Sequence, residues 1–173
     1  MSGIAGTRDR SVAPADLGDV AGRFPTGVVV VTTTADGSPS GMTASSFTYV
    51  SMRPPTVLVC VNRDNRVYRE ITRSRVYAVN VLGGSQGWIA QNFAVPGRSQ
   101  AERFARVAHR PAQTGSPVLI DASGWLDCQV MDVVESGTHA VFVAEVLAAG
   151  YDVWNETPLV YYRRAMFPLE EER

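Results

Sequence analysis

The sequence contains no lysine, because all 16 of its basic residues are arginine. This absence excludes a lysine Schiff base and a phosphate-binding loop that depends on lysine. The 17 acidic residues offset the arginines, so the formal net charge is only -1. A chain without an excess of positive charge has no electrostatic preference for nucleic acid or for an anionic membrane. We therefore expect neither as a partner.

Cysteines and long apolar runs are also scarce. Cys60 and Cys128 are the only cysteines, and their wide separation forms neither a CxxC pair nor a zinc-binding pattern. We expect two free thiols, no metal site and an intracellular location. No segment approaches the roughly 20 apolar residues that span a bilayer. Residues 1–13 are small and polar and lack the apolar region of a secretory signal. The sequence predicts a cytoplasmic protein with a flexible tail over 1–13 and one domain over 14–173.

β-Branched and apolar residues are concentrated in short segments between turn residues, which is typical of strands. We predict strands over 27–34, 39–50, 56–61, 75–82, 124–135, 139–149 and 158–163. The tight-turn pair Asp36-Gly37 should join the first two strands as a hairpin. Helices are predicted over 14–23, 62–73 and 85–93, with a helical turn near 101–105 in the irregular segment 94–116. A segment of that length without regular structure is usually functional or mobile. The pattern favours a mostly β fold with peripheral helices, either an antiparallel barrel or a sandwich.

The segment Gly41–Phe47 carries the clearest chemical signal. The hydroxyls of Thr43, Ser45 and Ser46 lie among small residues at the end of a predicted strand. Small side chains let a ligand approach the backbone, and N–H groups in a turn form an anion-binding concavity. Such a surface suits a phosphate or the nitrogen and oxygen edge of a planar heterocycle. The alternative is a hydroxyl-rich edge strand that faces water.

Several segments together resemble the flavin reductase-like family of short-chain NAD(P)H:flavin oxidoreductases. The resemblance extends over about residues 16–165, and the segments that carry it are Phe24–Thr33, Asp36-Gly37, Gly41–Phe47, Val50-Ser51, Pro54-Pro55, Val57–Asn62, Val79–Leu82, Gln91–Phe93, Arg103-Phe104, Pro117–Leu119, Trp125–Cys128, Gly137–His139 and Pro158–Arg163. It implies a split β-barrel that works as a homodimer and binds FMN or FAD. It also implies hydride transfer from NADH or NADPH, with reduced flavin supplied to a separate monooxygenase or halogenase.

The resemblance also implies which residues contact the flavin. Those that match the family's flavin-binding positions are Thr26, Thr43, Ala44, Ser45, Ser46, Cys60, Val61, Asn62, Asn65, Arg66, Phe93 and Tyr162. Asn65 and Arg66 are expected to meet a phosphate, and a helix N-terminus with a forked guanidinium supports that role independently. The alternatives are a solvated helix residue for Arg66 and an ordinary core residue for Phe93.

His139 matches the histidine of the family's Gly-Asp-His motif, which borders the nicotinamide pocket. Here the motif reads Gly137-Thr138-His139, so its carboxylate is missing. The resemblance implies that His139 is catalytic in the sense of orienting the nicotinamide; the alternative is an exposed residue at a strand start. A second departure follows Tyr162-Arg163, where the family usually continues Gly-Arg-Tyr and this chain reads Arg164-Ala165-Met166.

The chain has no GxGxxG segment after a strand, so a Rossmann site for the dinucleotide is not expected. The nicotinamide nucleotide should instead share the flavin groove. We hypothesise that backbone N–H groups around Ala44–Ser46 or Val61-Asn62 stabilise the negative charge that develops on reduced flavin. Two other functions stay open from the sequence. One is a flavin-binding carrier or sensor without NAD(P)H turnover, and the other is a different reaction on a similar split barrel.

Overall fold

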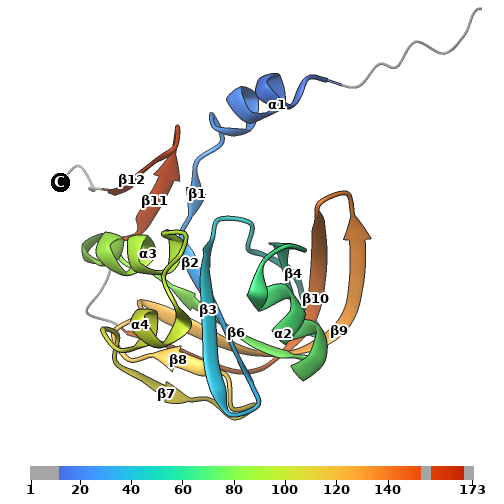
Figure 1. Ribbon diagram of the computed structural model, residues 1–173, viewed down its shortest axis with the longest axis vertical. Coiled ribbons are helices and arrows are strands. Elements are labelled where there is room, and N and C mark those ends of the chain that lie inside the picture. Colours follow the sequence, from blue (N-terminus) through green and yellow to red (C-terminus); the bar gives the residue numbers. More distant parts are fainter. Residues whose placement is uncertain (1–11, 153–156, 170–173) are drawn as a thin grey trace, which may run out of the picture.

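The computed structural model describes residues 12–152 and 157–169, and about half of these residues form antiparallel strands (Figure 1). The predicted tail over 1–13 therefore falls almost entirely outside the described residues. One seven-stranded sheet has the order β3-β2-β6-β9-β10-β5-β4. Its strands are β2 (Val29–Ala35), β3 (Ser38–Ala44), β4 (Thr48–Met52), β5 (Pro55–Asn62), β6 (Val76–Val81), β9 (Gly124–Ser136) and β10 (His139–Tyr151).

Smaller elements surround this sheet. A three-stranded sheet has the order β1-β11-β12, and a two-stranded sheet pairs β7 with β8. Their strands are β1 (Thr26–Gly27), β7 (His109–Pro111), β8 (Pro117–Leu119), β11 (Leu159–Tyr162) and β12 (Ala165–Pro168). The helices are α1 (Pro14–Ala21), α2 (Arg66–Ser74), α3 (Gly87–Ala94) and α4 (Gln100–Phe104), with a short 3-10 turn at Gly84–Gln86. Within the described ranges, no helix has the length and apolar character needed to cross a membrane.

The seven-stranded sheet curls into a barrel that stays open at one seam. Its two edge strands, β3 and β4, are connected by only Ser45–Phe47. Four residue steps reach at most about 15 Å, so the two edges must lie close together. β3 nevertheless pairs with β2 and β4 with β5, and the two edges share no ladder in the described residues. The fold is the expected mostly β split barrel with peripheral helices.

The predicted continuous strand over 39–50 is wrong. The chain leaves the sheet at Ala44 and re-enters it at Thr48, on the opposite edge. The break is needed because the two halves of this segment pair with different strands. We name the connecting residues Ser45–Phe47 the seam loop.

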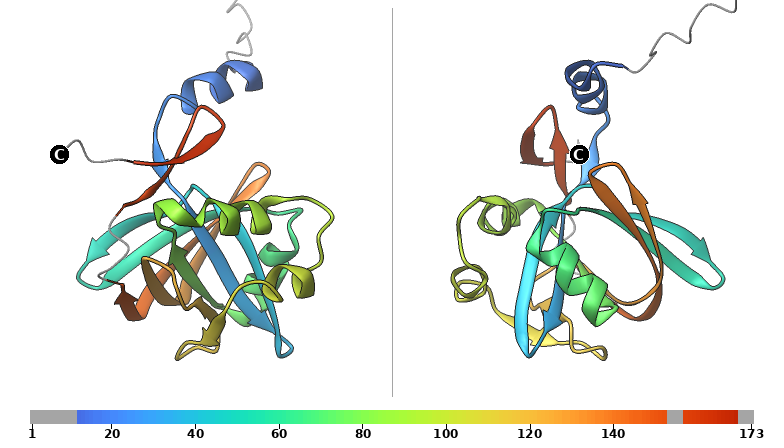
Figure 2. Two further views of the ribbon diagram at one scale, coloured as in Figure 1. Left: turned by 90° about the vertical axis from the view of Figure 1, so that its left-hand side faces the viewer. Right: turned by 45° about the vertical axis from the view of Figure 1, so that its right-hand side comes forward.

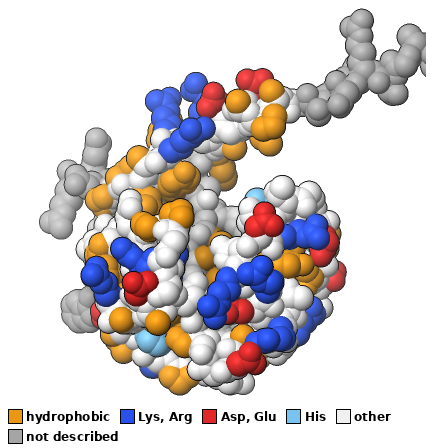
Figure 3. Space-filling model, viewed as in Figure 1, with side chains coloured by type: hydrophobic (Ala, Val, Ile, Leu, Met, Phe, Trp, Pro, Cys, Tyr) orange, Lys and Arg blue, Asp and Glu red, His pale blue; other side chains and the backbone are white. Residues whose placement is uncertain are grey.

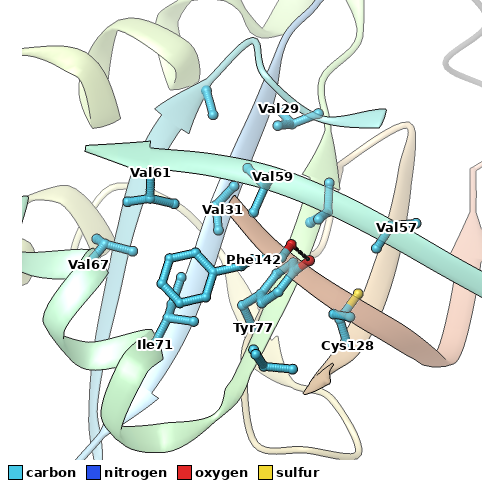
Figure 4. Packing of buried hydrophobic residues seen from close by; sticks show 14 of the residues in the cluster. Val29, Val31, Val57, Val59, Val61, Val67, Ile71, Tyr77, Cys128 and Phe142 are labelled. Atoms are coloured by element: carbon cyan, nitrogen blue, oxygen red, sulfur yellow. Dashed lines mark hydrogen bonds between the residues drawn. The ribbon is translucent and has the colours of Figure 1, made fainter. Parts of the chain in front are cut away.

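Helix α2 closes the interior of the barrel. Val67 and Ile71 point from α2 into the main core and are fully buried, together with Tyr77 and Phe142 (Figure 4). Asn65 begins the helix by accepting a hydrogen bond from the Val67 N–H at 2.9 Å. A capped start followed by an apolar stripe explains why the helix predicted over 62–73 is found.

A second core lies on the other side of the β2–β3 hairpin, under α3 and α4. The rings of Phe93 and Phe104 meet edge to face at 5.1 Å. Gly41 allows this packing, because a Cβ at its position would lie 2.9 Å from the Phe93 ring. Phe93 is only 2% exposed. It is therefore an ordinary core residue here and offers no surface to a ligand.

The irregular segment 94–116 is tied firmly to the barrel. The buried Arg103 guanidinium donates to the carbonyl oxygens of Asn92 at 2.9 Å, Val95 at 2.7 Å and Arg98 at 3.2 Å. The Gly41 N–H donates to Gln100 Oε1 at 2.9 Å, which joins α4 to the edge strand β3. The segment thus contains the expected helical turn, and it also contains β7. No local pattern marks β7 or β8, because each is three residues long and includes a proline.

Asn80 connects three strands from a fully buried position on β6. Its Nδ2 donates to the Val30 carbonyl oxygen at 3.0 Å and to Thr32 Oγ1 at 3.2 Å. Its Oδ1 accepts a hydrogen bond from the Leu119 N–H at 2.7 Å. One side chain therefore holds β2, β6 and β8 together, and it satisfies polar groups that water cannot reach.

Replacing Asn80 tests how much its amide group contributes to the stability of the fold. We expect Asn80→Ala to lower the free energy of unfolding by about 3 kcal/mol. The substitution leaves the buried Leu119 N–H without its acceptor and removes the two hydrogen bonds that Asn80 Nδ2 donates. Urea unfolding followed by tryptophan fluorescence measures the change. Thr72→Ala, at an exposed position on α2, is the control and should change the value by less than about 0.5 kcal/mol. Equal stability of the two variants would contradict the assignment.

Candidate functional site

A pocket of about 210 Å³ opens where β3 ends, between the barrel and the small sheet. Thr43, Ala44 and Ser45 form one side of it, as the sequence predicted for a ligand surface. The Thr43 hydroxyl donates to the Ala90 carbonyl oxygen of α3 at 2.6 Å, so its orientation is fixed. The remaining lining is Val28, Ala94, Tyr161 and Met166. Apolar walls around a few polar groups are what a planar heterocycle requires.

The seam loop lies beside this pocket and offers unpaired backbone donors. The N–H groups of Ser45, Ser46 and Phe47 make no hydrogen bond to any described residue. The Ser46 hydroxyl, in contrast, is engaged twice with Cys60 of β5. Ser46 Oγ donates to the Cys60 carbonyl oxygen at 2.9 Å and accepts from the Cys60 N–H at 3.2 Å. One side chain therefore fastens the seam loop to β5 and restrains the backbone that carries the free N–H groups.

Thr26 supplies a further polar group close to the pocket. It pairs with Tyr161, which lines the pocket. The Thr26 Oγ1 atom is buried and has no hydrogen-bond partner among the described residues. A buried hydroxyl without a partner costs free energy unless a ligand or a water satisfies it. Together with the seam-loop donors, it gives a donor set that fits the nitrogen and oxygen edge of a flavin ring.

Asn65 and Arg66, which the sequence predicts to meet a phosphate, form a second group together with Asn62 at the junction of β5 and α2. The side chains of Asn62 and Asn65 accept hydrogen bonds from the backbone N–H groups of Asp64 and Val67, at 2.8 and 2.9 Å. Arg66 Nε donates to Glu70 Oε1 at 2.6 Å, and 57% of the Arg66 side chain is exposed. Arg66 is thus the only one of the three whose charge and exposure suit direct contact with an anion.

His139 stands at the start of β10, exposed and opposite Asn62 in the strand register. Its Nδ1 lies 2.9 Å from Thr138 Oγ1. The Thr138 hydroxyl therefore contacts the ring nitrogen that a carboxylate would otherwise orient. Asn62 is two residues, or about 7 Å, beyond Cys60 along β5. The seam loop is bound to Cys60, and its first residue, Ser45, lines the pocket at the end of β3. It therefore connects this pocket with the strand end where Asn62 and His139 lie opposite each other.

The remaining predicted residues Cys60, Val61 and Tyr162 do not line the pocket at the end of β3. Val61 has no exposed surface, so only its backbone could serve a ligand. Burial raises the pKa of the half-buried Cys60 thiol, as expected for a small packing residue. Tyr162 stacks under the Arg163 guanidinium at 5.2 Å, and its neighbour Tyr161 lines the pocket instead.

Sequence reasoning missed Val28, Ala94, Tyr161 and Met166 as pocket residues. Tyr161 and Met166 pair across β11 and β12, and Tyr161 pairs with Thr26 of β1. Only the pairing of the two chain ends brings them to the pocket. The one local signal for Tyr161 is that successive side chains of a strand point to opposite sides, so Tyr161 and Tyr162 cannot both face the pocket. In the described part of the chain, no three His, Cys, Asp or Glu side chains gather as a metal site would require.

Comparison with known proteins shows the family of the chain. A family model described as the flavin reductase like domain matches residues 21–170. The reductase component of 4-nitrophenol 4-monooxygenase/4-nitrocatechol 2-monooxygenase from Rhodococcus opacus is 42% identical over 149 residues, which are 86% of this chain and 77% of the relative.

Two solved structures extend the match to three dimensions. BorF, the flavin reductase component of a bacterial two-component tryptophan halogenase, superposes with a TM-score of 0.85 at 31% identity and covers 92% of this chain and 100% of its own. The NADH:FAD oxidoreductase SgcE6 of Streptomyces globisporus C-1027, in complex with NAD and FAD fragments, gives 0.84 at 33% identity, with 93% and 97% covered. Sequence, fold and site geometry agree, and the chain belongs to the family of the flavin reductase like domain.

Proposed function

We propose that this protein is an NAD(P)H:flavin oxidoreductase that transfers a hydride from a reduced nicotinamide to FMN or FAD. The observation that carries this proposal is the pocket at the end of β3, flanked by the three unpaired N–H groups of the seam loop. The relatives named as flavin reductases or reductase components support the same reaction. The reduced flavin leaves and serves a separate monooxygenase or halogenase.

The protein contributes position and electrostatics to this reaction. A bound flavin supplies the hydride-accepting chemistry, as cofactors do in general. The seam-loop N–H groups would donate hydrogen bonds to a bound flavin ring, and fixed donors of this kind lower the cost of the negative charge that develops on it. Arg66 holds the flavin phosphate. His139, oriented by Thr138 at 2.9 Å, holds the nicotinamide. No side chain is required as a covalent nucleophile.

We further propose that the active form is a homodimer in the cytoplasm. The pocket of about 210 Å³ lies below the roughly 300–1,000 Å³ of a complete ligand site, so a second copy would supply a wall. Helix α1 supports this, since it has no buried residue and projects from the barrel (Figure 2). The side chains of Leu17 and Val20 on α1, and of Phe24 just after it, are 63–72% exposed, which is unusual unless another surface covers them. The free cysteines fit a reducing compartment.

Turnover is the first test. Purified protein should oxidise NADH or NADPH, followed at 340 nm, at a rate that saturates with added FMN or FAD. Riboflavin, which lacks the phosphate, should give a higher KM because Arg66 has no group to bind. Flavin binding without nucleotide oxidation would overturn the enzyme assignment and favour a flavin carrier or sensor.

The seam loop can be tested through the Ser46 hydroxyl. We expect Ser46→Ala to weaken FMN and FAD binding about tenfold, since the donors of the loop lose their fixed position; this corresponds to about 1.4 kcal/mol. Quenching of flavin fluorescence measures the dissociation constant. Ser85→Ala, at an exposed position of the 3-10 turn Gly84–Gln86, is the matched control and should bind as the parent protein does. An unchanged constant in Ser46→Ala would reject the role of the seam.

His139 can be tested against the only other histidine in the sequence, His109. We expect His139→Ala to raise the apparent KM for NADH about five- to tenfold, a loss of about 1 kcal/mol of binding, and to leave the KM for flavin within a factor of two. His109→Ala removes an exposed imidazole whose ring packs on Phe104, and its kinetics should not change. A parallel rise in both KM values for His139→Ala would show that the residue serves the fold rather than the nicotinamide.

A further inference from the structure

Helix α1 and the turn after it carry apolar side chains that their own chain does not cover. Leu17 and Val20 are three residues apart, so they lie on one face of the helix, and Phe24 follows its end. These three side chains are 63%, 68% and 72% exposed. Figure 3 shows hydrophobic side chains at the surface of the projecting helix. Helices shorter than about 12–15 residues are marginal in water. Because α1 has eight residues, we expect another surface to stabilise it.

The end of α1 is fastened at a distance from the rest of the barrel. The Arg163 N–H donates to the Gly22 carbonyl oxygen at 2.9 Å, and the Arg164 guanidinium lies 3.9 Å from Asp19 Oδ1. Both contacts join α1 to the β11–β12 hairpin. The two views of Figure 2 show α1 beside this hairpin and well apart from the β4–β5 hairpin. The apolar face of α1 therefore cannot reach the β4–β5 side of its own barrel.

An apolar pocket of about 600 Å³ opens on that other side of the barrel, and we name it the core pocket. Phe47, Val81 and Leu126, which line it, also pack against the main core, so the pocket exposes part of the core to water. Its other large side chains are Trp125 and Tyr151, and Tyr151 is 81% exposed. An exposed apolar surface of this kind usually marks an interaction site.

The chemistry of the core pocket favours an apolar protein surface over a small polar ligand. A small-molecule site adds a few well-placed polar groups to its apolar walls. Among the lining side chains, polar atoms are limited to the indole N–H of Trp125 and the hydroxyl of Tyr151. The Arg110 guanidinium lies 5.1 Å from the centre of the Trp125 ring, so one cation stands beside the pocket. Helix α1 contains two aspartates and no basic residue, which complements this charge.

We infer that α1 of a second copy of this chain packs into the core pocket of the first, and that the exchange is reciprocal. This inference rests on the proposed function, which includes a homodimer. Each copy gives a helix and receives one, so the same two surfaces are used on both sides, as in a two-fold symmetric interface. The exchange covers two exposed apolar surfaces that lie too far apart to cover each other within one chain.

The exchange also completes the flavin site, because the seam loop reaches both pockets. Ser45, its first residue, lines the pocket at the end of β3, and Phe47, its last residue, lines the core pocket. Ser46 fastens the middle of the loop to Cys60. A helix packed on Phe47 restrains the far end of the loop that carries the free N–H groups. Flavin binding and the association of two copies are therefore coupled, and each strengthens the other.

The first test weakens the contact from either side. Leu17→Glu places a charge on the apolar face of α1, where no side chain is buried in the single chain. We expect the dimer dissociation constant, measured by analytical ultracentrifugation, to rise at least about tenfold. The dissociation constant for FMN should rise about fivefold at protein concentrations where the variant is monomeric. Tyr151→Glu should have both effects from the side of the pocket. Trp88→Glu, at a 54% exposed position on α3, is the matched control and should change neither constant.

Crosslinking identifies the surfaces that meet. Chains with Val20→Cys are mixed with chains that carry Tyr151→Cys, and the mixture is treated with a short bismaleimide. Because each chain has one introduced thiol, a link between these two positions can form only between copies. We expect this link in the mixture, identified by mass spectrometry of the joined peptides. Each variant alone should give no more crosslinked dimer than the parent protein, whose Cys60 and Cys128 set the background.

Three results would overturn the exchange. A dimer that survives both glutamate substitutions would place the interface elsewhere and leave the core pocket free for another ligand. Crosslinking of the Val20→Cys chain with itself would mean that two α1 helices pair with each other. A monomeric Leu17→Glu protein that binds FMN as tightly as the parent protein would show that the seam loop needs no second copy. Absence of NADH or NADPH oxidation by a crosslinked parent dimer would instead contradict the proposed function and leave the exchange in place.

Discussion

Three residues connect the two edges of one seven-stranded sheet, and the rest of the molecule depends on this short connection. Ser45–Phe47 leave no length for the sheet to lie open, so it must curl until β3 and β4 are neighbours. The curled sheet encloses the main core, and α2 covers it with Val67 and Ile71. The edges β3 and β4 do not pair with each other, and the Ser46 hydroxyl fastens the loop between them to Cys60 of β5. The seam is therefore a fixed opening in the barrel.

An open seam solves a problem that a closed barrel would create. Backbone N–H groups in a ladder are consumed by their partners, and those at a surface turn are free but poorly positioned. In the seam loop the N–H groups of Ser45, Ser46 and Phe47 stay free while the two bonds between Ser46 and Cys60 hold the backbone. Preorganised donors of this kind stabilise developing charge without having to reorganise. The same feature thus closes the fold and prepares a surface for a heterocycle.

Local sequence patterns predict those parts of the fold that local forces determine. β2 follows a run of valine and threonine, and α2 has an asparagine cap and an apolar stripe, so both are predicted close to their true bounds. The hydroxyl-rich block Gly41–Phe47 can be recognised from its residue types. The change from one edge strand to the other inside this block cannot be recognised, because a change of pairing partner has no local sequence signature. Long-range pairing also decides that Tyr161, and not Tyr162, lines the pocket. The family resemblance assigns Phe93 to the flavin, whereas its burial follows from distant contacts with Gly41 and Phe104.

The environments of the two thiols, buried Cys128 and half-buried Cys60, have a consequence for a protein that releases reduced flavin in air. Free reduced flavin reacts with oxygen and yields peroxide close to its source, and peroxide attacks thiolates rather than thiols. Burial, with the nearby Asp127 carboxylate as a smaller contribution, raises the pKa of Cys128 to about 12, and burial also raises that of Cys60. At neutral pH the raised pKa keeps Cys128 in the thiol form. The core that shapes the barrel therefore also protects the Cys128 sulfur atom from the by-product of the protein's own chemistry.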